Sequence, residues 1–344
     1  MYITQLNLKD FKSHAENEIH FKNITLLTGL NGAGKSSIFQ SLRMFWQYLK
    51  TNDMVLTEYG KLQTLKNSNS KETYFSLLLY IENKQVFELL NNDFQCAIGT
   101  RDAFEESVKQ INFSYISANR QGPTEFQHIR NGIHENNVGI YGEYTLDVLS
   151  KFSDTLLPES FKDEINKQNT LENHVEKWLQ EISPNIKLKK EIYKEMNIAS
   201  FTINGYTPLN VGFGISYTLS IIVQLLYSVI LLDQHKIKTV LLIENPEAHL
   251  HPKGQTKIAE FITKIANFGV QVIVETHSDY ILDGLRIAVK DKIIDKDKTQ
   301  LYYFELDNDL NTKVLSPTIG EDGHLNEWPE NFFDTSLENK MRLM

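Results

Sequence analysis

Short apolar runs alternate with helical patterns in two parts of the chain. In the first part, Ile24–Leu27 reads as a buried strand, and Ile38, Leu42, Phe45 and Leu49 follow at helical spacing. The second part gives strands at Thr239–Glu244 and Val270–Val274, with helices at Gly254–Phe268 and Asp279–Val289. An unbroken apolar run is typical of a buried parallel strand, and strand–helix alternation indicates a parallel sheet covered by helices. The predicted fold class is therefore α/β.

Other segments alternate apolar and polar residues in the manner of antiparallel strands. A meander is predicted over Tyr74–Glu82, Gln85–Leu90 and Phe94–Ile98, and a hairpin over Leu301–Leu306 and Lys313–Leu315. Further strands are predicted at Tyr2–Leu8, Glu18–Phe21 and Ile111–Ser117. The sheet is thus expected to be mixed, with a parallel core and an antiparallel meander.

Residues 125–200 are richer in charge and mostly helical in pattern, with one clear amphipathic helix at Leu171–Ile182. A basic cluster within them, Lys187 to Lys194, is interleaved with glutamates and is interpreted as a solvated face. The run Ile215–Leu232 is long enough to span a membrane, but serine, threonine and glutamine residues interrupt it. A helix that is apolar on every side is more often buried in a large α/β core, and we expect that here.

The residues between the first strand and its helix form a phosphate-binding pattern. Thr28–Ser37 contains G-x-x-x-x-G-K-[ST], and its glycines let backbone N–H groups curl around phosphate oxygens. Lys35 is then expected at the terminal phosphates and the Ser36 hydroxyl at Mg²⁺. The sequence predicts a nucleoside triphosphate site made by Asn31, Gly32, Ala33, Gly34, Lys35, Ser36 and Ser37.

Polar residues also follow the strands of the second part. Glu244 ends one strand and is followed by Asn245-Pro246-Glu247, and a carboxylate at this place can complete a Mg²⁺ shell. His277 follows the next strand. His249 and His251 beside glutamates would suit zinc, but the preferred interpretation is loop structure, because no spacing typical of an open zinc site accompanies them.

Two loops remain as weaker candidates. Gly212 and Gly214 open a long helix, whose free N–H groups and dipole can bind a phosphate. Ala118–Pro123 is polar and follows a strand, so it either contacts a ligand or is a turn imposed by Gly122-Pro123. Position alone leaves both readings of this second loop open.

Composition narrows the class of protein. With 41% hydrophobic and 23% charged residues, the chain has the make-up of an ordinary soluble globular protein. The net charge of -9 gives no support to a surface coated for nucleic acid. A single cysteine, Cys96, excludes an internal disulfide, and the N-terminal residues lack a signal-peptide pattern. We therefore expect a cytoplasmic protein without a membrane partner.

Taken together, these motifs resemble an ABC-type ATPase head of the SMC/RecF/OLD kind. The resemblance rests on Asp10-Phe11-Lys12-Ser13, the glycine loop, and Glu247-Ala248-His249-Leu250-His251-Pro252, which is typical of the OLD-like branch. It implies ATP and Mg²⁺ as cofactors, with Ser36, Gln121 and Glu244 around the metal. It also implies a signature motif at Gly212 and Gly214, a switch histidine at His277, and a head-to-tail homodimer through the ATP sites. The tail around Trp328-Pro329 resembles a C-terminal domain of unknown function.

Three positions depart from the family pattern. Gly212 replaces the signature serine, Glu244 stands where aspartate is usual, and Asn245 occupies the place of the catalytic glutamate. An amide can orient water but cannot accept its proton, and general-base help is worth about 10²–10⁴ in rate. The resemblance therefore implies slow hydrolysis, unless Glu247 or His277 acts as the base.

The leading hypothesis is an ATP-gated switch that controls an effector encoded nearby, a nuclease or toxin, as in Septu-like anti-phage systems. The alternatives are a RecF-like DNA-binding repair clamp, which keeps nucleic acid open as a ligand, and, last, a nuclease. The expected division is an ATPase lobe at 1–124, a helical lobe at 125–209, a second ATPase part at 210–290 and an extension at 291–344.

Overall fold

A computed structural model describes residues 2–82, 84–90, 111–131, 137–162, 169–329, 333 and 341–343. The predicted strand Phe94–Ile98 lies outside these residues. By contacts the chain divides into unit 1, residues 1–113 and 296–344, and unit 2, residues 114–295. Each unit is described by itself.

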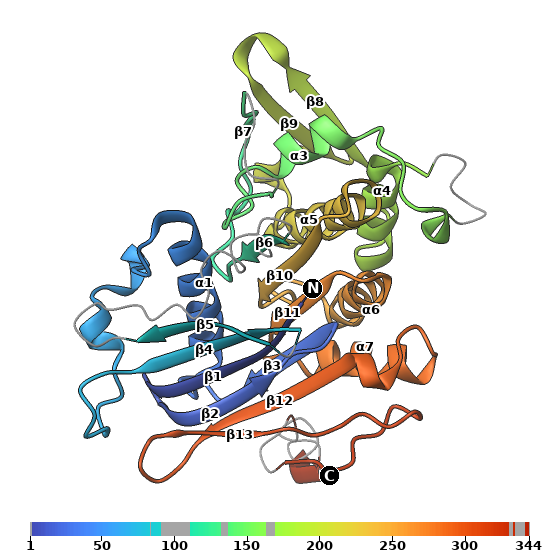
Figure 1. Cartoon of the computed structure of the whole chain (residues 1–344). Helices are drawn as coiled ribbons and strands as arrows, with labels where there is room; N and C mark the ends of the chain where they lie inside the picture. The colour runs from blue at the N-terminus through green and yellow to red at the C-terminus, as the bar shows by residue number, and fades with distance from the viewer. Residues whose placement is uncertain are drawn as a thin grey trace. The chain divides into compact units, whose positions relative to one another are not determined.

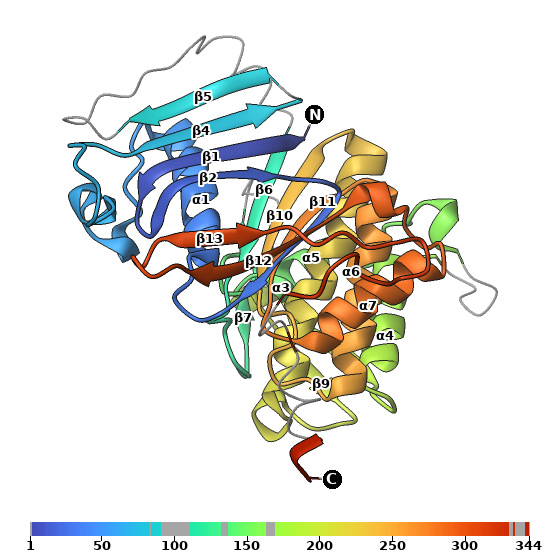
Figure 2. The ribbon, with the colours of Figure 1, turned by 90° about the horizontal axis from the view of Figure 1, so that it is seen from below.

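Unit 1 contains a four-stranded antiparallel sheet in the order β2-β1-β4-β5, and Figure 2 shows these strands side by side. The strands are β1 (Ile3–Phe11), β2 (His14–His20), β4 (Ser76–Ile81) and β5 (Lys84–Leu90). Leu6 faces Ile19 on one neighbour and Leu79 on the other, and all three side chains are buried. The meander predicted for β4 and β5 is thus confirmed for the strands within the described residues.

The second part of unit 1 joins segments from both ends of the chain. Strand β3 (Ile24–Gly29) pairs in parallel with β12 (Thr299–Leu306), which pairs antiparallel with β13 (Thr312–Leu315). Helix α1 (Lys35–Thr51) follows β3, and its buried face carries Ile38, Leu42 and Phe45 as the pattern predicted. Because β12 runs beside β3, Phe304 lies opposite Gly29, where the glycine loop begins.

Unit 2 is built from strand–helix repeats. Strands β10 (Lys238–Glu244) and β11 (Gln271–Glu275) are parallel, and helices α6 (Pro252–Phe268) and α7 (Asp279–Lys290) follow them in turn. Glu244 lies opposite Glu275 in the register, so the polar residues after both strands begin at one edge. Strand β6 (Ile111–Ile116) contains the point in the sequence, after residue 113, at which unit 2 begins. The predicted α/β class, with parallel and antiparallel strands together, is confirmed.

The mostly helical pattern predicted for residues 125–200 is wrong in one respect. This segment contains α3 (Thr145–Phe152) and α4 (Leu171–Ile182), but also the strands β7 (Gln127–His128), β8 (Leu188–Tyr193) and β9 (Ile198–Ile203). Figure 1 shows β8 and β9 as one hairpin, with β7 beside β9. The lysines and the glutamate of β8 obscured the alternation of apolar and polar residues by which a strand is predicted. Lys189 and Glu191 form an exposed pair, as expected of a solvated face, whereas the Lys190 side chain is only 11% exposed and pairs with Glu172 of α4.

Helix α5 (Phe213–His235) is the run that could be mistaken for a membrane span. Within unit 2 it packs against α3, α4, α6 and β10, and 78% of its most apolar window is buried. The apolar surface is therefore covered by the protein itself, as expected for a core helix. Short 3₁₀ helices complete the described chain: Thr57–Tyr59, Leu62–Leu65, Glu159–Phe161, Lys194–Met196, Pro208–Asn210 and Lys296–Lys298.

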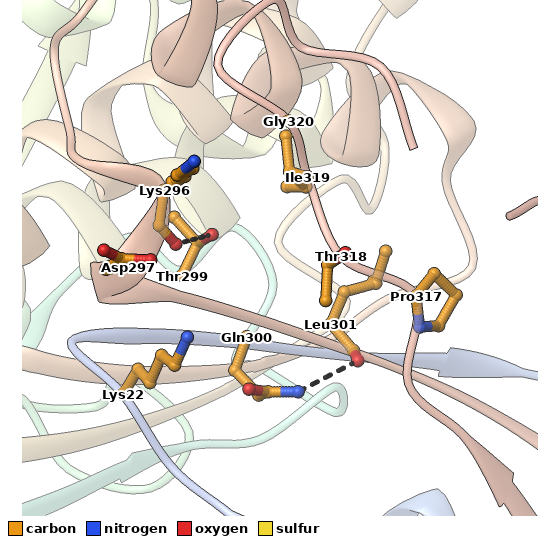
Figure 3. Close-up of a pocket in the computed structure, with 10 residues that line it drawn as sticks. All are labelled: Lys22, Lys296, Asp297, Thr299, Gln300, Leu301, Pro317, Thr318, Ile319 and Gly320. Carbon is orange, nitrogen blue, oxygen red and sulfur yellow. Dashed lines mark hydrogen bonds between the residues drawn. The ribbon is translucent and has the colours of Figure 1, made fainter. Parts of the chain in front are cut away.

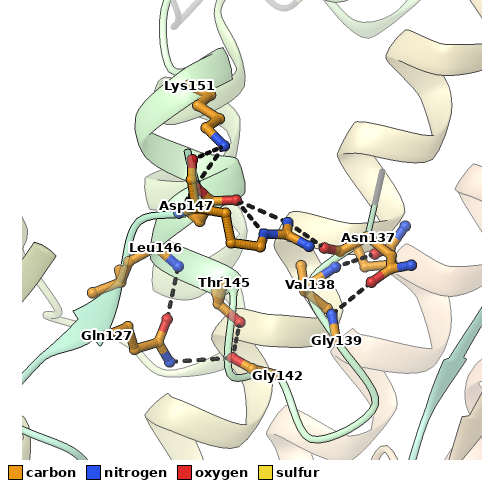
Figure 4. Close-up of polar contacts among 11 residues, drawn as sticks. Gln127, Asn137, Val138, Gly139, Gly142, Thr145, Leu146, Asp147 and Lys151 are labelled. Atoms are coloured by element: carbon orange, nitrogen blue, oxygen red, sulfur yellow. Dashed lines mark hydrogen bonds and ion pairs between the residues drawn. The ribbon is translucent and has the colours of Figure 1, made fainter. Parts of the chain in front are cut away.

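A buried polar network holds the segment that precedes α3 in unit 2. Asp147 is 1% exposed and accepts from the backbone N–H and side chain of Arg130 and from Lys151 (Figure 4). Two cations compensate this carboxylate, so its burial is tolerated. Val138 donates its N–H to Gln224 of α5 at 2.9 Å, which ties the same segment to the core helix.

Candidate functional site

The glycine loop of unit 1 has the backbone that its pattern requires. Gly29, Gly32 and Gly34 have φ values of 133°, 78° and 100°, a region that favours glycine. Asn31, Gly32 and Ser36 are exposed, whereas Ala33, Lys35 and Ser37 are buried. The loop therefore presents one polar face to solvent while the other is packed against the unit.

Lys35 lies inside the curl of this loop. Its ammonium group donates to the carbonyls of Gly29 and Leu30 at 2.9 and 2.8 Å, and the residue is 3% exposed. Helix α1 begins at Lys35, with no side-chain cap at Gly34 and no acidic residue in its first turn. N–H groups at such a helix start, next to a lysine, form a site that suits phosphate.

Unit 2 gathers the polar residues at the ends of β10 and β11. Glu244 accepts the Ala118 N–H through Oε2 at 2.8 Å. Asn245 donates its backbone N–H to the Glu275 carbonyl at 2.8 Å and has a positive φ of 43°. Its side-chain Oδ1 is buried without a hydrogen-bond partner among the described residues. The amide oxygen is therefore an acceptor that nothing in the described chain satisfies.

Glu247 is brought to the same place by the turn after β10. Its Oε1 accepts the backbone N–H of His277 at 2.9 Å, while Oε2 is buried without a partner among the described residues. Burial raises the pKa of this carboxyl above its ordinary value, partly opposed by the His277 hydrogen bond. Glu244, Asn245, Glu247 and the His277 backbone thus lie at the ends of β10 and β11, and His277 is an exposed residue.

Arg120 is a residue of this cluster that the sequence interpretation missed. Its guanidinium donates to the carbonyls of Glu244 and Asn245 at 2.7 and 2.8 Å and lies 5.0 Å from the Tyr217 ring centroid. Burial lowers the pKa of Arg120 to about 10. The polar loop after β6 indicated a ligand contact at this place, but the family resemblance favoured Gln121 within it. Gln121 is exposed and donates its backbone N–H to the Tyr141 carbonyl.

The two glycines before α5 differ in surroundings. Gly212 is the N-cap, is exposed, and has no atom within 4 Å of the place where a Cβ would stand. A Cβ on Gly214 would lie 2.6 Å from the His249 carbonyl oxygen, so this glycine is required by packing within unit 2. Phe213, between them, packs on the His249 ring and is half exposed. The start of the helix thus has room for a side chain at Gly212 but none at Gly214.

The histidines of the turn have structural roles. His251 caps α6 by accepting the Lys253 N–H, and His249 packs against Phe213 and Tyr217. Over the ranges that the structure describes, no group of three or more His, Cys, Asp or Glu residues could hold a metal ion. The loop reading of His249 and His251 is the one that the contacts support.

Unit 1 also contains a cavity of about 320 Å³, shown in Figure 3. Lys22 and Lys296 line it together with Thr299 and Gln300 at the start of β12 and Pro317–Gly320 after β13. Lys296 is 3.1 Å from Glu321, so part of its charge is already compensated. None of the predicted site residues belongs to this cavity.

Two family models match the chain. Residues 1–131 and 104–282 match the family described as "AAA ATPase domain". Residues 294–343 match a family described as "Protein of unknown function (DUF3696)". No curated protein matches the sequence.

Solved structures give the fold. The Smc head bound to the C-winged helix domain of ScpA is similar with a TM-score of 0.58 and 16% identity, covering 93% of this chain and 99% of that one. The Smc head domain with an extended coiled coil, bound to the C-terminal domain of ScpA from Pyrococcus furiosus, has a TM-score of 0.55 and 15% identity, covering 99% and 98%. The chain thus has the mixed α/β fold of an SMC head.

Proposed function

We propose, from the premise that this chain belongs to the AAA ATPase domain family, that it is an ATP-gated switch. It binds ATP with Mg²⁺, dimerises on binding, hydrolyses slowly, and controls a partner effector in anti-phage defence. The single observation that carries the proposal is the glycine loop, in which Lys35 is buried at the start of an uncapped helix.

The donor set of the chain fits the nucleotide and its metal. Loop N–H groups and Lys35 bind phosphate oxygens, and the Ser36 hydroxyl and the Glu244 carboxylate are oxygen ligands of the kind that Mg²⁺ prefers. When bound, the metal neutralises charge on the phosphates. Gly212 and the uncapped start of α5 are proposed to meet the phosphates bound by a second copy of the chain.

Slow turnover follows from the groups around the attacking water. We assign Asn245 to orient that water through its unsatisfied Oδ1. Glu247 is proposed as a residual base that takes the proton slowly, because one of its carboxylate oxygens already accepts the His277 N–H and only the other is unpartnered among the described residues.

The effector is the part of the proposal that depends on a partner. The two SMC heads of similar fold are described as bound to domains of ScpA, so that fold accommodates a partner protein. We propose a nuclease or toxin encoded near this chain as the partner here. A nucleotide-dependent dimer would expose or withdraw the surface that the partner recognises.

Light scattering with nucleotide tests the switch. Wild-type protein with ATP and Mg²⁺ should become a dimer and with ADP should remain a monomer, whereas Lys35→Ala should neither bind ATP tightly nor dimerise. Co-expression with the neighbouring genes should recover the effector with the wild type in a nucleotide-dependent way. ATP binding by Lys35→Ala equal to that of wild type would contradict the site. Strong, salt-dependent duplex binding by the isolated protein would instead favour the RecF-like clamp.

A further inference from the structure

Two buried side chains from distant parts of unit 1 form hydrogen bonds with consecutive backbone carbonyls of the glycine loop. His14, at the start of β2, places Nε2 3.0 Å from the Gly34 carbonyl oxygen. Thr312, at the start of β13, places Oγ1 3.0 Å from the Ala33 carbonyl oxygen. Both contacts lie on the packed side of the loop, because His14 is 0% and Thr312 6% exposed.

The side chain is the hydrogen-bond donor in each contact, because a carbonyl oxygen has no proton to donate. A carbonyl only accepts, so the Thr312 hydroxyl gives its proton to Ala33 and accepts one from the Ser13 hydroxyl, 2.7 Å away. Burial lowers the pKa of His14, so the ring is neutral and carries one N–H, which Nε2 donates to Gly34. The structure places the Asn17 Oδ1 atom 2.8 Å from Nδ1. With the ring protonated at Nε2, we assign the opposite orientation to this amide, so that its NH₂ donates to Nδ1.

Holding these carbonyls fixes the N–H groups that face the other way. In a planar trans peptide the C=O and the following N–H point in opposite directions. With the Ala33 and Gly34 carbonyls turned to the packed side, the N–H groups of Gly34 and Lys35 are directed to the open side of the loop. That is the arrangement a phosphate requires of such a loop.

The same contacts explain the glycine between them. A Cβ at Gly34 would lie 2.5 Å from Thr312 Oγ1 and 2.7 Å from His14 Nε2, and its φ is 100°. Any other residue would push both donors away from the carbonyls. Gly34, His14 and Thr312 therefore form one tightly packed arrangement.

We propose that Ser13, His14, Asn17 and Thr312, here called the rear clamp, are positioning residues for nucleotide binding. Since Thr312 belongs to the segment 294–343, this assigns part of that segment to the nucleotide site. Phe304 of the same segment accepts the Leu30 N–H at 3.1 Å and supports the loop at its other end. The inference rests on the proposed function, because the loop must bind ATP for the clamp to matter.

The test removes one hydroxyl and keeps the shape. Thr312→Val should weaken binding of a fluorescent ATP analogue about tenfold, the size expected when a buried acceptor loses its donor. Thr312→Ser retains the hydroxyl and should bind like wild type. Thr318→Val makes the same chemical change at an exposed threonine of the same segment and should also bind like wild type. Melting temperatures of all three variants report whether each is folded.

The outcomes separate the clamp from the function. Wild-type protein that does not bind ATP contradicts the proposed function. If the wild type binds ATP and Thr312→Val binds it equally well, the rear clamp is overturned but the proposed function is not. The same holds if Thr312→Ser binds as weakly as Thr312→Val. Should Thr312→Val fail to fold, Ser13→Ala gives the decision: it leaves Thr312 without the donor that orients it and should weaken binding about threefold. Unchanged affinity in folded Ser13→Ala would then reject the inference.

Discussion

At the scale of single residues, the proposed hydrolysis depends on the two side chains that flank Pro246. Asn245 supplies an amide whose oxygen is buried and unpartnered among the described residues, and Glu247 supplies a carboxylate with one oxygen in the same condition. Both residues are held by backbone contacts, Asn245 through Glu275 and Arg120, and Glu247 through His277. Exchanging either side chain therefore tests a role in hydrolysis.

Asn245→Glu should raise single-turnover ATP hydrolysis by about tenfold or more, because it restores a carboxylate able to take a proton from water. Asn245→Gln is the matched control. Both substitutions introduce a longer side chain at a positive φ of 43°, so both carry the same backbone strain, but only glutamate is a base. Equal rates in the two variants would show that position 245 does not face the attacking water.

Glu247→Gln should abolish hydrolysis while making the protein more stable at neutral pH. Burial raises the folded pKa of Glu247 above 4.5, so the folded state holds this proton more tightly than the unfolded chain. The free energy of unfolding therefore falls as pH rises from the unfolded pKa through the raised one. The glutamine amide does not ionise, so the variant does not lose this free energy of unfolding as pH rises.

The measurement is the melting temperature of wild type and Glu247→Gln from acid to neutral pH. The variant should gain most above the raised pKa, and the difference should shrink toward pH 4.5. Glu260→Gln is a control at a partly buried carboxylate, 20% exposed, whose charge is paired with Lys257. A gain that does not vary with pH, or hydrolysis that persists in Glu247→Gln, would contradict the assignment of Glu247 as base.

At the scale of elements, helix α5 combines a core role with an open N-terminus. Its middle is buried on all sides, and its first turn has no side-chain cap and no acidic residue. The packing of Gly214 against the His249 carbonyl fixes where the helix starts. Its free N–H groups are therefore held at a rigid place from which they can bind an anion.

Gly212→Glu should block ATP-driven dimerisation and leave ATP binding by the monomer unchanged. The residue has a φ of −60° and empty space around its Cβ position, so glutamate fits without strain, but its charge would repel a partner's phosphates. Gly212→Ala is the uncharged control and should dimerise. Gly214 is unsuitable for this test, because a side chain there would strike His249.

Light scattering with ATP decides the outcome. A switch from mostly monomer to mostly dimer needs about 5 kcal/mol of nucleotide-dependent contact, which one misplaced charge can largely remove. Dimerisation of Gly212→Glu as complete as that of wild type would remove this helix start from the dimer interface.

At the scale of the whole molecule, unit 1 is assembled from both ends of the chain. Strands β1 to β3 come from its first residues, and β12 and β13 from residues after 296. The loop that carries Lys35 therefore receives the Thr312 contact on its packed side only when the last strands have docked. Pairing across such a sequence separation is slow to form and gains its contacts late in folding.

Local patterns in the sequence determined the elements and the kinds of chemistry. The β3–loop–α1 order, the bounds of α4, the two strand–helix repeats and the hairpin of β12 and β13 all follow from apolar spacing, turn residues and glycines. Glu244, Asn245 and Glu247 could be proposed because polar residues after parallel strands share one edge of a sheet. Each of these signals lies within a few residues of the element it predicts.

The tertiary structure alone decided which distant residues support the site. Arg120 became a member of the β10 cluster because its guanidinium reaches two carbonyls more than a hundred residues away, at 2.7 and 2.8 Å. Thr312 meets the glycine loop through the pairing of β12 with β3 and the antiparallel placement of β13, whereas His14 reaches the loop from β2. Side chains that bind backbone carbonyls leave no local pattern, because any buried donor at the right place satisfies a carbonyl.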